Sequence, residues 1–251
     1  MQRPSYTLAL VAILTAVAAV SLAQADSSGA MPRNYGGFAV GGQAFAVNSL
    51  NRALALQRYP EFESAGVDLS VLRWSRGKGR LASQARLGLT FFARPNSTRF
   101  TTNAGGSVET TYRNVDLGAI AVGLGYYVDL LYPSAWDLYV GAEFGMLAGR
   151  LTTSSFQTTA RDEPDFDNPT SEVRHLWGSA YITPELKLHS VEFSLGGVPS
   201  RITATVGYRL ASDGDLTRKG FDDLETNLAI DPDGLRGTLG LISLVPTKRR
   251  R

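Results

Sequence analysis

The clearest pattern in the chain is a run of alternating residues from His175 to His189, which reads HLWGSAYITPELKLH. Successive side chains of a β-strand point to opposite faces, so alternation of this length predicts an extended strand. One face is apolar or small and consists of Leu176, Gly178, Ala180, Ile182, Pro184, Leu186 and Leu188. The other face consists of His175, Trp177, Ser179, Tyr181, Thr183, Glu185, Lys187 and His189. A long strand with one apolar and one charged face is typical of a transmembrane barrel.

Similar alternation elsewhere predicts eight strands in all. Their expected ranges are Tyr35–Val47, Ala65–Trp74, Arg80–Arg94, Val108–Leu130, Trp136–Ser154, His175–Ser194, Arg201–Ala211 and Gly234–Val245. A short helix is expected between the first two strands, from Asn48 or Ser49 to about Arg58, because Asn and Ser cap helices and Pro60 follows directly. Pro184 cannot donate a backbone hydrogen bond, so we expect a bulge or local break at that position.

The predicted lipid-facing positions are apolar on strand after strand. They include Phe38 and Val40, then Val67, Leu69 and Val71, then Leu87, Leu89 and Phe91, and then Ile120, Val122, Leu124 and Tyr126. The connections alternate in length, with short turns at Ser75–Gly79, Leu131–Ala135 and Gly196–Ser200 and long polar loops between the others. Aromatic residues expected to form a girdle near the short turns are Tyr35, Trp74, Tyr126, Tyr127, Tyr132 and Trp136.

The ends of the chain and its composition indicate the cellular compartment of the protein. Residues 1–25 are predicted to be a secretory signal peptide, with Arg3, an apolar run and the small-residue pattern Ala23-Gln24-Ala25. Residues 26–34 form an N-terminal segment, residues 35–245 the barrel domain and residues 246–251 a basic tail. The chain has no cysteine, which excludes disulfides and thiolate metal sites. A basic tail of this length does not indicate nucleic-acid binding, and no phosphate-binding glycine loop precedes a helix.

On these features the chain resembles the small eight-stranded outer-membrane β-barrel proteins of Gram-negative bacteria over residues 35–245. The resemblance rests on alternation, strand count, loop asymmetry and the signal peptide, without a diagnostic motif. It implies an all-β fold, an eight-stranded antiparallel up-and-down transmembrane β-barrel with a short helix between strands one and two. It also implies a monomer in the cell outer membrane, with outer-membrane lipids and lipopolysaccharide as partners.

Charged residues on the predicted inner face are the candidate site. They are Arg86, Glu143, Glu185, Lys187, Arg201 and Arg209, with Asp129 near the short-turn rim. An eight-stranded barrel is only wide enough for side chains, so these charges are expected to form a paired network. The alternative is a narrow conduit or a small-ligand site, which the small inward residues of the first and fourth strands would favour. The helix near Leu50 would either fill that space or lie outside it.

No catalytic, metal or cofactor site is predicted. His175 and His189 are the only histidines, and they lie about 45 Å apart on one strand at roughly 3.3 Å per residue. The carboxylates of the two acidic loops lack EF-hand spacing and are expected to be solvated. They are Asp162, Glu163, Asp165, Asp167, Asp213, Asp215, Asp222, Asp223, Asp231 and Asp233.

Three functions remain open at this stage. The first is a non-enzymatic outer-membrane barrel with a structural, adhesive or narrow-transport role. The second is a soluble exported barrel that binds an apolar ligand as lipocalins do, which would require Leu176, Ile182 and Leu186 to face inward. The third is an outer-membrane enzyme that modifies lipids.

Overall fold

A computed structural model describes residues 33–77, 79–93, 95–104, 107–159, 165–212, 214–215, 217–219 and 229–245. The predicted signal peptide, residues 26–32 and the basic tail lie outside the described residues. The elements are β1 (Arg33–Ala44), α2 (Asn48–Leu56), β2 (Ala65–Arg76), β3 (Leu81–Phe92), β4 (Thr98–Ala104), β5 (Ser107–Asp129), β6 (Asp137–Thr159), β7 (Ser171–His189), β8 (Phe193–Leu195), β9 (Val198–Ala211), β10 (Gly214–Asp215), β11 (Thr217–Lys219), β12 (Ala229–Ile230) and β13 (Gly234–Leu244).

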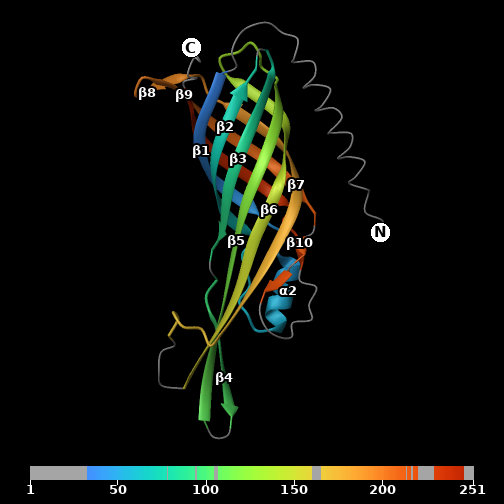
Figure 1. The fold of residues 1–251 in the computed structure, drawn as a ribbon, viewed down its shortest axis with the longest axis vertical. Helices are drawn as coiled ribbons and strands as arrows, with labels where there is room; N and C mark the ends of the chain where they lie inside the picture. The colour runs from blue at the N-terminus through green and yellow to red at the C-terminus, as the bar shows by residue number, and fades with distance from the viewer. Residues whose placement is uncertain are drawn as a thin grey trace, which may run out of the picture.

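Eight of these strands form a closed antiparallel ring (Figure 1). Each of β1, β2, β3, β5, β6, β7, β9 and β13 pairs with the next, and β13 pairs back with β1. Closure removes the free edges that an open sheet would leave, so the backbone of the ring satisfies its own hydrogen bonds. The predicted eight-stranded up-and-down barrel with a helix after the first strand is confirmed.

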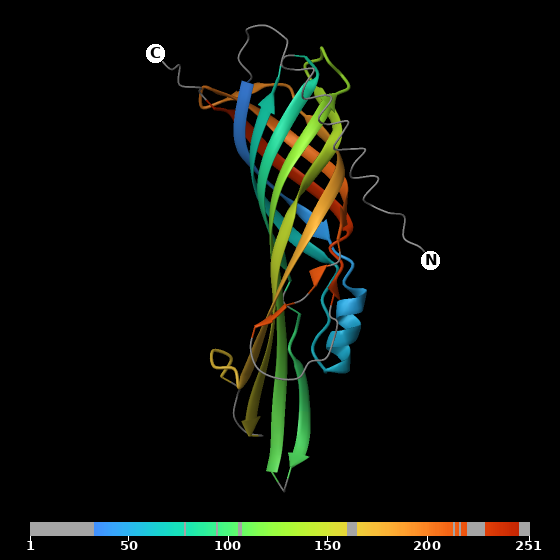
Figure 2. The ribbon, with the colours of Figure 1, turned by 45° about the vertical axis from the view of Figure 1, so that its right-hand side comes forward.

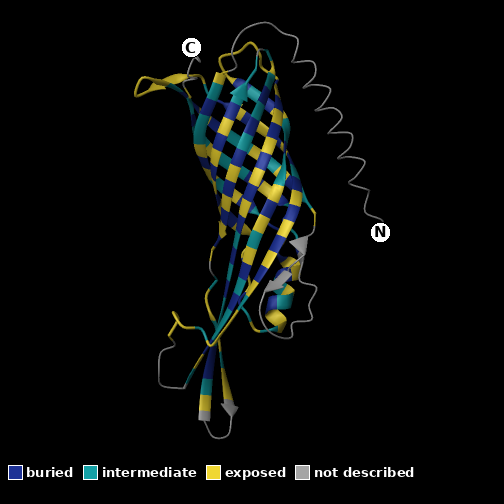
Figure 3. Cartoon of the chain, viewed as in Figure 1, coloured by how far each residue is buried: buried dark blue, intermediate teal, exposed yellow. Residues whose placement is uncertain are grey.

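The outer face of the ring carries an apolar belt of exposed side chains, and Figure 3 shows how exposed and buried residues alternate along its strands. Val40 pairs with Leu69, Leu69 with Leu89, and Leu89 with Ile120, and all four side chains are exposed. The belt continues on the other strands with Val122, Leu124, Met146, Leu186, Leu188, Ile202, Val206, Leu235 and Leu239. Side chains of alternate positions are buried inside the ring. Apolar residues outside and charged residues inside are the polarity of a barrel in a lipid bilayer, and the architecture is that of an outer-membrane barrel.

Pro184 produces a local break in one ladder. Pairing between β7 and β9 joins Ile182 to Leu210 and resumes from Glu185 to Gly207, without pairs at Thr183 and Pro184. The register is the same on both sides of the gap, so proline interrupts the ladder without shifting it. The predicted break is confirmed, and on its other side Pro184 still pairs with Ala142 of β6.

The short-turn end differs from the sequence-based expectation in two respects. The sixth strand was expected to continue to about Ser194, but β7 ends at His189, and β8 forms a separate small hairpin with the start of β9. Tyr35, Trp74 and Tyr127 do not join an exposed girdle, because they have inward parity and are at most 2 % exposed. In the same region Tyr126, Tyr132 and Trp136 are exposed as predicted.

At the opposite end, β5, β6 and β7 continue past the ring, and together with β4 they form an extension (Figures 1 and 2). Pairing of β3 with β5 stops at Gly118, whereas β5 continues to pair with β6 as far as Glu109 and Thr159. The stretch Pro95–Gly106 was predicted as a loop, but Thr98–Ala104 is the strand β4, which pairs with the start of β5. The side chains of this segment are mostly polar, so its sequence shows no alternation of apolar and polar residues. Threonine nevertheless favours strands.

Helix α2 lies beyond the rim at this long-loop end rather than within the ring (Figure 2). Its Leu50 and Leu54 are buried in an apolar cluster with Phe45, Phe92 and Trp177. The side chain of Asn51 bonds the backbone N–H and C=O of Phe62, which ties the helix to the chain that follows it. The helix therefore caps the mouth of the barrel.

A charge on the belt tests the membrane assignment. Val122 is 56 % exposed near the middle of β5, so Val122→Arg should destabilise the folded barrel by about 2–4 kcal/mol, the depth-dependent cost of a lipid-facing arginine. Thr101→Arg, at an exposed position of β4, is the control and should change stability little. Urea unfolding in lipid vesicles measures both, and equal stability of the two variants would contradict a lipid-facing belt.

Candidate functional site

A layer of charged side chains lies across the middle of the lumen. Its carboxylates are Asp68 of β2, Glu143 of β6 and Glu185 of β7, and each is at most 4 % exposed. The cations that pair with them are Arg86 of β3, Lys187 of β7 and Arg236 of β13. The alternation of each strand brings these residues to the same interior, and pairing is what makes burial of so many charges possible.

Arg236 is the centre of this layer. Its Nη1 lies 2.8 Å from Glu185 Oε1 and 3.5 Å from Glu143 Oε1, and its Nε lies 3.1 Å from Asp68 Oδ2. Arg86 pairs with Asp68 and, at 3.3 Å, with Glu143. One arginine therefore joins carboxylates from three strands that are far apart in the sequence.

Two tyrosines close the layer from either side. Tyr181 donates its hydroxyl to Glu143 Oε1 at 2.8 Å, and Tyr127 donates to Glu185 Oε2 at 2.8 Å. The ring of Tyr127 also lies 4.8 Å from Lys187 Nζ. Each phenol therefore presents its hydroxyl to the charges and its ring to the apolar residues beyond them.

Apolar clusters seal the lumen on both sides of the charged layer. Toward the short turns, Trp74 packs against Tyr127, Tyr139 and His189 with ring centroids 4.7–5.2 Å apart. Toward the extension, Phe45 packs against Phe92 and Trp177 below helix α2. The lumen is thus filled by three successive layers, two apolar and one charged.

The small inward residues do not leave an open channel. A Cβ on Gly123 would lie 2.5 Å from the hydroxyl of Tyr181, and one on Gly125 would overlap the ring of Tyr127. On β6, a Cβ on Gly149 would overlap the indole of Trp177. These glycines accommodate large rings from neighbouring positions, so the space that the small inward residues of the fourth predicted strand would leave is occupied at Gly123 and Gly125.

Two predicted members of the network lie elsewhere or lack a partner. Arg201 is at the short-turn rim, where it pairs with Asp137 and Arg76 Nη1 reaches the same carboxylate at 2.8 Å. Arg209 is fully buried, and its guanidinium nitrogens have no hydrogen-bond partner among the described residues. Its guanidinium carbon lies 4.4 Å from the centroid of the Tyr181 ring.

Sequence reasoning missed Asp68 and Arg236. Asp68 lies between Val67 and Leu69, both predicted to face lipid, so the alternation already assigned it to the lumen. Arg236 follows the exposed Leu235 by the same rule, but the inner and outer faces of the last strand were not separated. The pairing of these two residues, 168 positions apart, follows only from ring closure.

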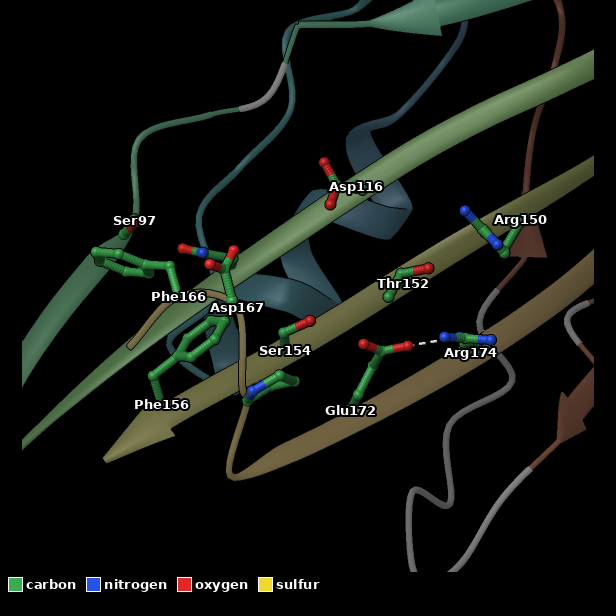
Figure 4. Close-up of a pocket in the computed structure, with 12 residues that line it drawn as sticks. Ser97, Asp116, Arg150, Thr152, Ser154, Phe156, Phe166, Asp167, Glu172 and Arg174 are labelled. Carbon is green, nitrogen blue, oxygen red and sulfur yellow. Dashed lines mark hydrogen bonds and ion pairs between the residues drawn. The ribbon is translucent and has the colours of Figure 1, made fainter. Parts of the chain in front are cut away.

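The extension carries an open pocket of about 540 Å³ (Figure 4). Its floor is formed by side chains from three adjacent strands: Asn114 and Asp116 of β5, Arg150, Thr152 and Ser154 of β6, and Glu172 and Arg174 of β7. Phe156, Phe166 and Asp167 stand together at one end, and the other charged residues lie toward the opposite end. Glu172 and Arg174 pair with each other within the pocket (Figure 4).

The segment 165–169 forms the side of this pocket. Asn168 Nδ2 donates to Asp165 Oδ2 at 2.7 Å, and the backbone N–H of Asp167 donates to Asp165 Oδ1 at 3.0 Å. The hydrogen bond from the Asn168 side chain lowers the pKa of Asp165. Phe166 is held by ring contacts with Phe156 at 5.3 Å and Tyr112 at 5.9 Å. Asp162, Glu163, Asp213, Asp222 and Asp223 lie outside the described residues, and the side chain of Asp215 is also not described.

The two histidines occupy opposite ends of β7, and both are buried. Within the described ranges, no group of three His, Asp or Glu side chains is arranged to hold a metal ion. The described helix is too short and too polar to cross a bilayer.

Two buried arginines on neighbouring strands test the charged layer. Arg236→Met removes the partner of three carboxylates and should lower the free energy of unfolding by about 3–5 kcal/mol, because a buried charge without a partner is costly. Arg209→Met removes an arginine without an ion pair and should leave stability unchanged or higher. Urea unfolding in detergent micelles measures both, and an equal loss for the two variants would contradict this account.

Comparison with known proteins gives structural likeness without sequence likeness. No protein-family model and no curated protein sequence matches the chain. Solved structures that it is similar to include Ail, the attachment invasion locus protein of Yersinia pestis, with a TM-score of 0.40, 9% identity and coverage of 85% of this chain and 97% of that one. They also include the outer membrane protein OprG from Pseudomonas aeruginosa, with a TM-score of 0.38, 11% identity and coverage of 86% and 96%. A third is a major outer membrane protein from Thermus thermophilus, with a TM-score of 0.34, 10% identity and coverage of 84% and 99%.

Proposed function

We propose that this chain is an adhesive outer-membrane protein in which a sealed barrel anchors an outer β-sheet extension that makes the functional contacts. The observation that carries this proposal is the contrast between the two parts. The barrel interior is filled, whereas the extension exposes a pocket and polar strand surfaces. A structural role of the barrel is part of the same proposal.

The filled lumen argues against a transport role. A solute would have to displace the aromatic cluster around Trp74, the ion pairs of Arg236 and the cluster below α2 in succession. Breaking the middle layer leaves buried charges without partners, which is costly. The aromatic cluster around Trp74 and the charged layer are built from strands of the ring, so opening these two layers requires a change in the barrel itself.

The length of the extension supports a role outside the bilayer. Residues 107–117 of β5 continue beyond the last pair with β3, which at roughly 3.3 Å per residue is about 35 Å. β6 pairs with β5 along this stretch from Glu109 onward, β4 pairs with its outer part from Ser107 to Arg113, and β7 extends beside β6 as far as Ser155. In outer-membrane barrels the short turns are periplasmic and the long connections external, which directs the extension away from the cell.

The two other functions find no support. A lipocalin-like barrel would bury its apolar side chains, but Leu176 and Leu186 are exposed while Glu185 and Lys187 are buried. A lipid-modifying enzyme would need its catalytic groups in one place, and His175 and His189 lie at opposite ends of β7.

The absence of cysteine allows a direct test of orientation. Thr101→Cys places a single thiol on β4, and Ser134→Cys places one in the turn between β5 and β6; both positions are exposed. A membrane-impermeant maleimide should label Thr101→Cys on intact cells, and label Ser134→Cys only after the outer membrane is permeabilised. The reverse pattern would contradict the proposed orientation, and labelling of neither on intact cells would contradict surface exposure.

Conductance tests the sealed lumen. Purified protein inserted in a planar bilayer should give no steady ion current, because the three layers leave no continuous aqueous path. Insertion is verified by the different gel mobility of folded and boiled protein. A steady, ion-selective current from verified insertions would favour transport over adhesion.

A further inference from the structure

The pocket on the extension lies directly beyond the apolar belt. In register, Ile120 pairs with Ala148 and Ala148 with Gly178, which is the last row without a charged residue on these three strands. Four residues further along, Asp116 pairs with Thr152 and Thr152 with Arg174. These rows share the outward face, so the same surface changes from lipid-facing to polar within four residues of each strand.

One end of the pocket offers an aromatic surface. Phe166 is 52 % exposed, although its ring is fixed by edge contacts with Tyr112 and by the ring of Phe156, which is 5 % exposed. A phenylalanine that is held in place and yet half exposed presents an apolar face to whatever enters the pocket. The apolar face of Phe166 is small and the remaining walls of the pocket are mostly polar, so the pocket does not suit a wholly apolar ligand.

The rest of the pocket is lined by planar polar groups of both kinds. Asp116, Asp167 and Glu172 supply acceptors, Arg150 and Arg174 supply donors, and Asn114 supplies both. Figure 4 shows Asp167 beside the two phenylalanines, with Arg150 and Arg174 toward the other end of the pocket. The carboxylates and guanidinium groups nearly balance in charge, so the site favours a ligand with many neutral polar groups over a strongly charged one.

We propose that this pocket binds a saccharide. A pyranose ring has an apolar C–H face, which fits against Phe166, and a rim of hydroxyl groups that both donate and accept hydrogen bonds. Carboxylate and guanidinium groups each bond two neighbouring hydroxyls at once: Asp167 lies beside Phe166 and can contact the stacked ring, and Arg150 lies toward the other end of the pocket, where it can contact a second sugar unit. A volume of about 540 Å³ accommodates one or two sugar units.

The proposal rests on the proposed function, since it requires the extension to lie outside the cell. Two sources supply the same chemistry there. One is the sugar portion of the glycolipids that form the outer leaflet, which would lie level with the pocket just beyond the belt. The other is a glycan on another cell or in the medium.

The experiment uses the full mature chain in detergent micelles and saturation-transfer NMR, with two sets of probes. The first is the delipidated oligosaccharide released from outer-membrane lipopolysaccharide, and the second is a panel of free host-type glycans. Phe166→Ala should weaken binding about tenfold, the effect of losing one aromatic contact of about 1.4 kcal/mol. Phe166→Tyr should keep it, and Arg150→Gln should weaken it through the hydroxyl contacts.

Phe193→Ala is the matched control, because it removes a 36 % exposed phenylalanine from β8 at the other end of the molecule and should not change binding. All variants must retain the gel-mobility shift of a folded barrel. Binding in either set that depends on Phe166 supports the proposal and identifies the source. Absence of binding in both sets, or binding that Phe166→Ala and Arg150→Gln leave unchanged, overturns it. Cysteine labelling at Thr101 would still report an external extension, so the two failures are distinguishable.

Discussion

Closing eight strands into one hydrogen-bonded ring is the constraint on which the rest of the structure depends. Once the ring closes, every second side chain points into a space that water cannot fill freely, and a charged side chain there is costly unless it is paired. Arg236 meets this requirement for β2, β6 and β7 together through Asp68, Glu143 and Glu185. The layer therefore connects β13 and β2 with β6 and β7, with which they share no ladder, and it fixes how these strands face each other across the lumen.

The strands and their lipid-facing sides could be predicted from the sequence, because the alternation of apolar and polar residues is a local property of each strand. Val67, Leu69 and Val71 indicate the outward face of β2 with no knowledge of the other strands, and the same holds for Ile120, Val122 and Leu124 on β5. The position of a residue along the barrel axis cannot be predicted in this way, because it depends on the register of every strand pair. Arg201, Arg209 and Arg86 all point inward, yet only Arg86 reaches the charged layer, and no local pattern distinguishes them.

The expected strands Val108–Leu130 and Trp136–Ser154 already include much of the extension, but β4 was not predicted, for a related reason. Beyond the belt both faces of β5 and β6 leave the lipid, so polar residues such as Asn114 and Thr152 satisfy the outer face and alternation disappears. What maintains the strands is the backbone ladder, which depends little on side-chain type. A segment such as Thr98–Ala104 then reads as a loop in the sequence, although its backbone pairs along its whole length with β5.

The strands β5, β6 and β7 pass from lipid into water, and the pocket is a consequence of that change of environment. Within the apolar belt, the outward positions of β5, β6 and β7 must be apolar, and any hollow between them would be filled by lipid chains. In the extension, the strands keep their spacing while the side chains become polar, so a hollow between them can hold water or a polar ligand. The segment 165–169 encloses that hollow and places Phe166 at the end of the polar floor that lies away from the belt. A rigid barrel thus positions a binding surface that its own sealed interior could not provide.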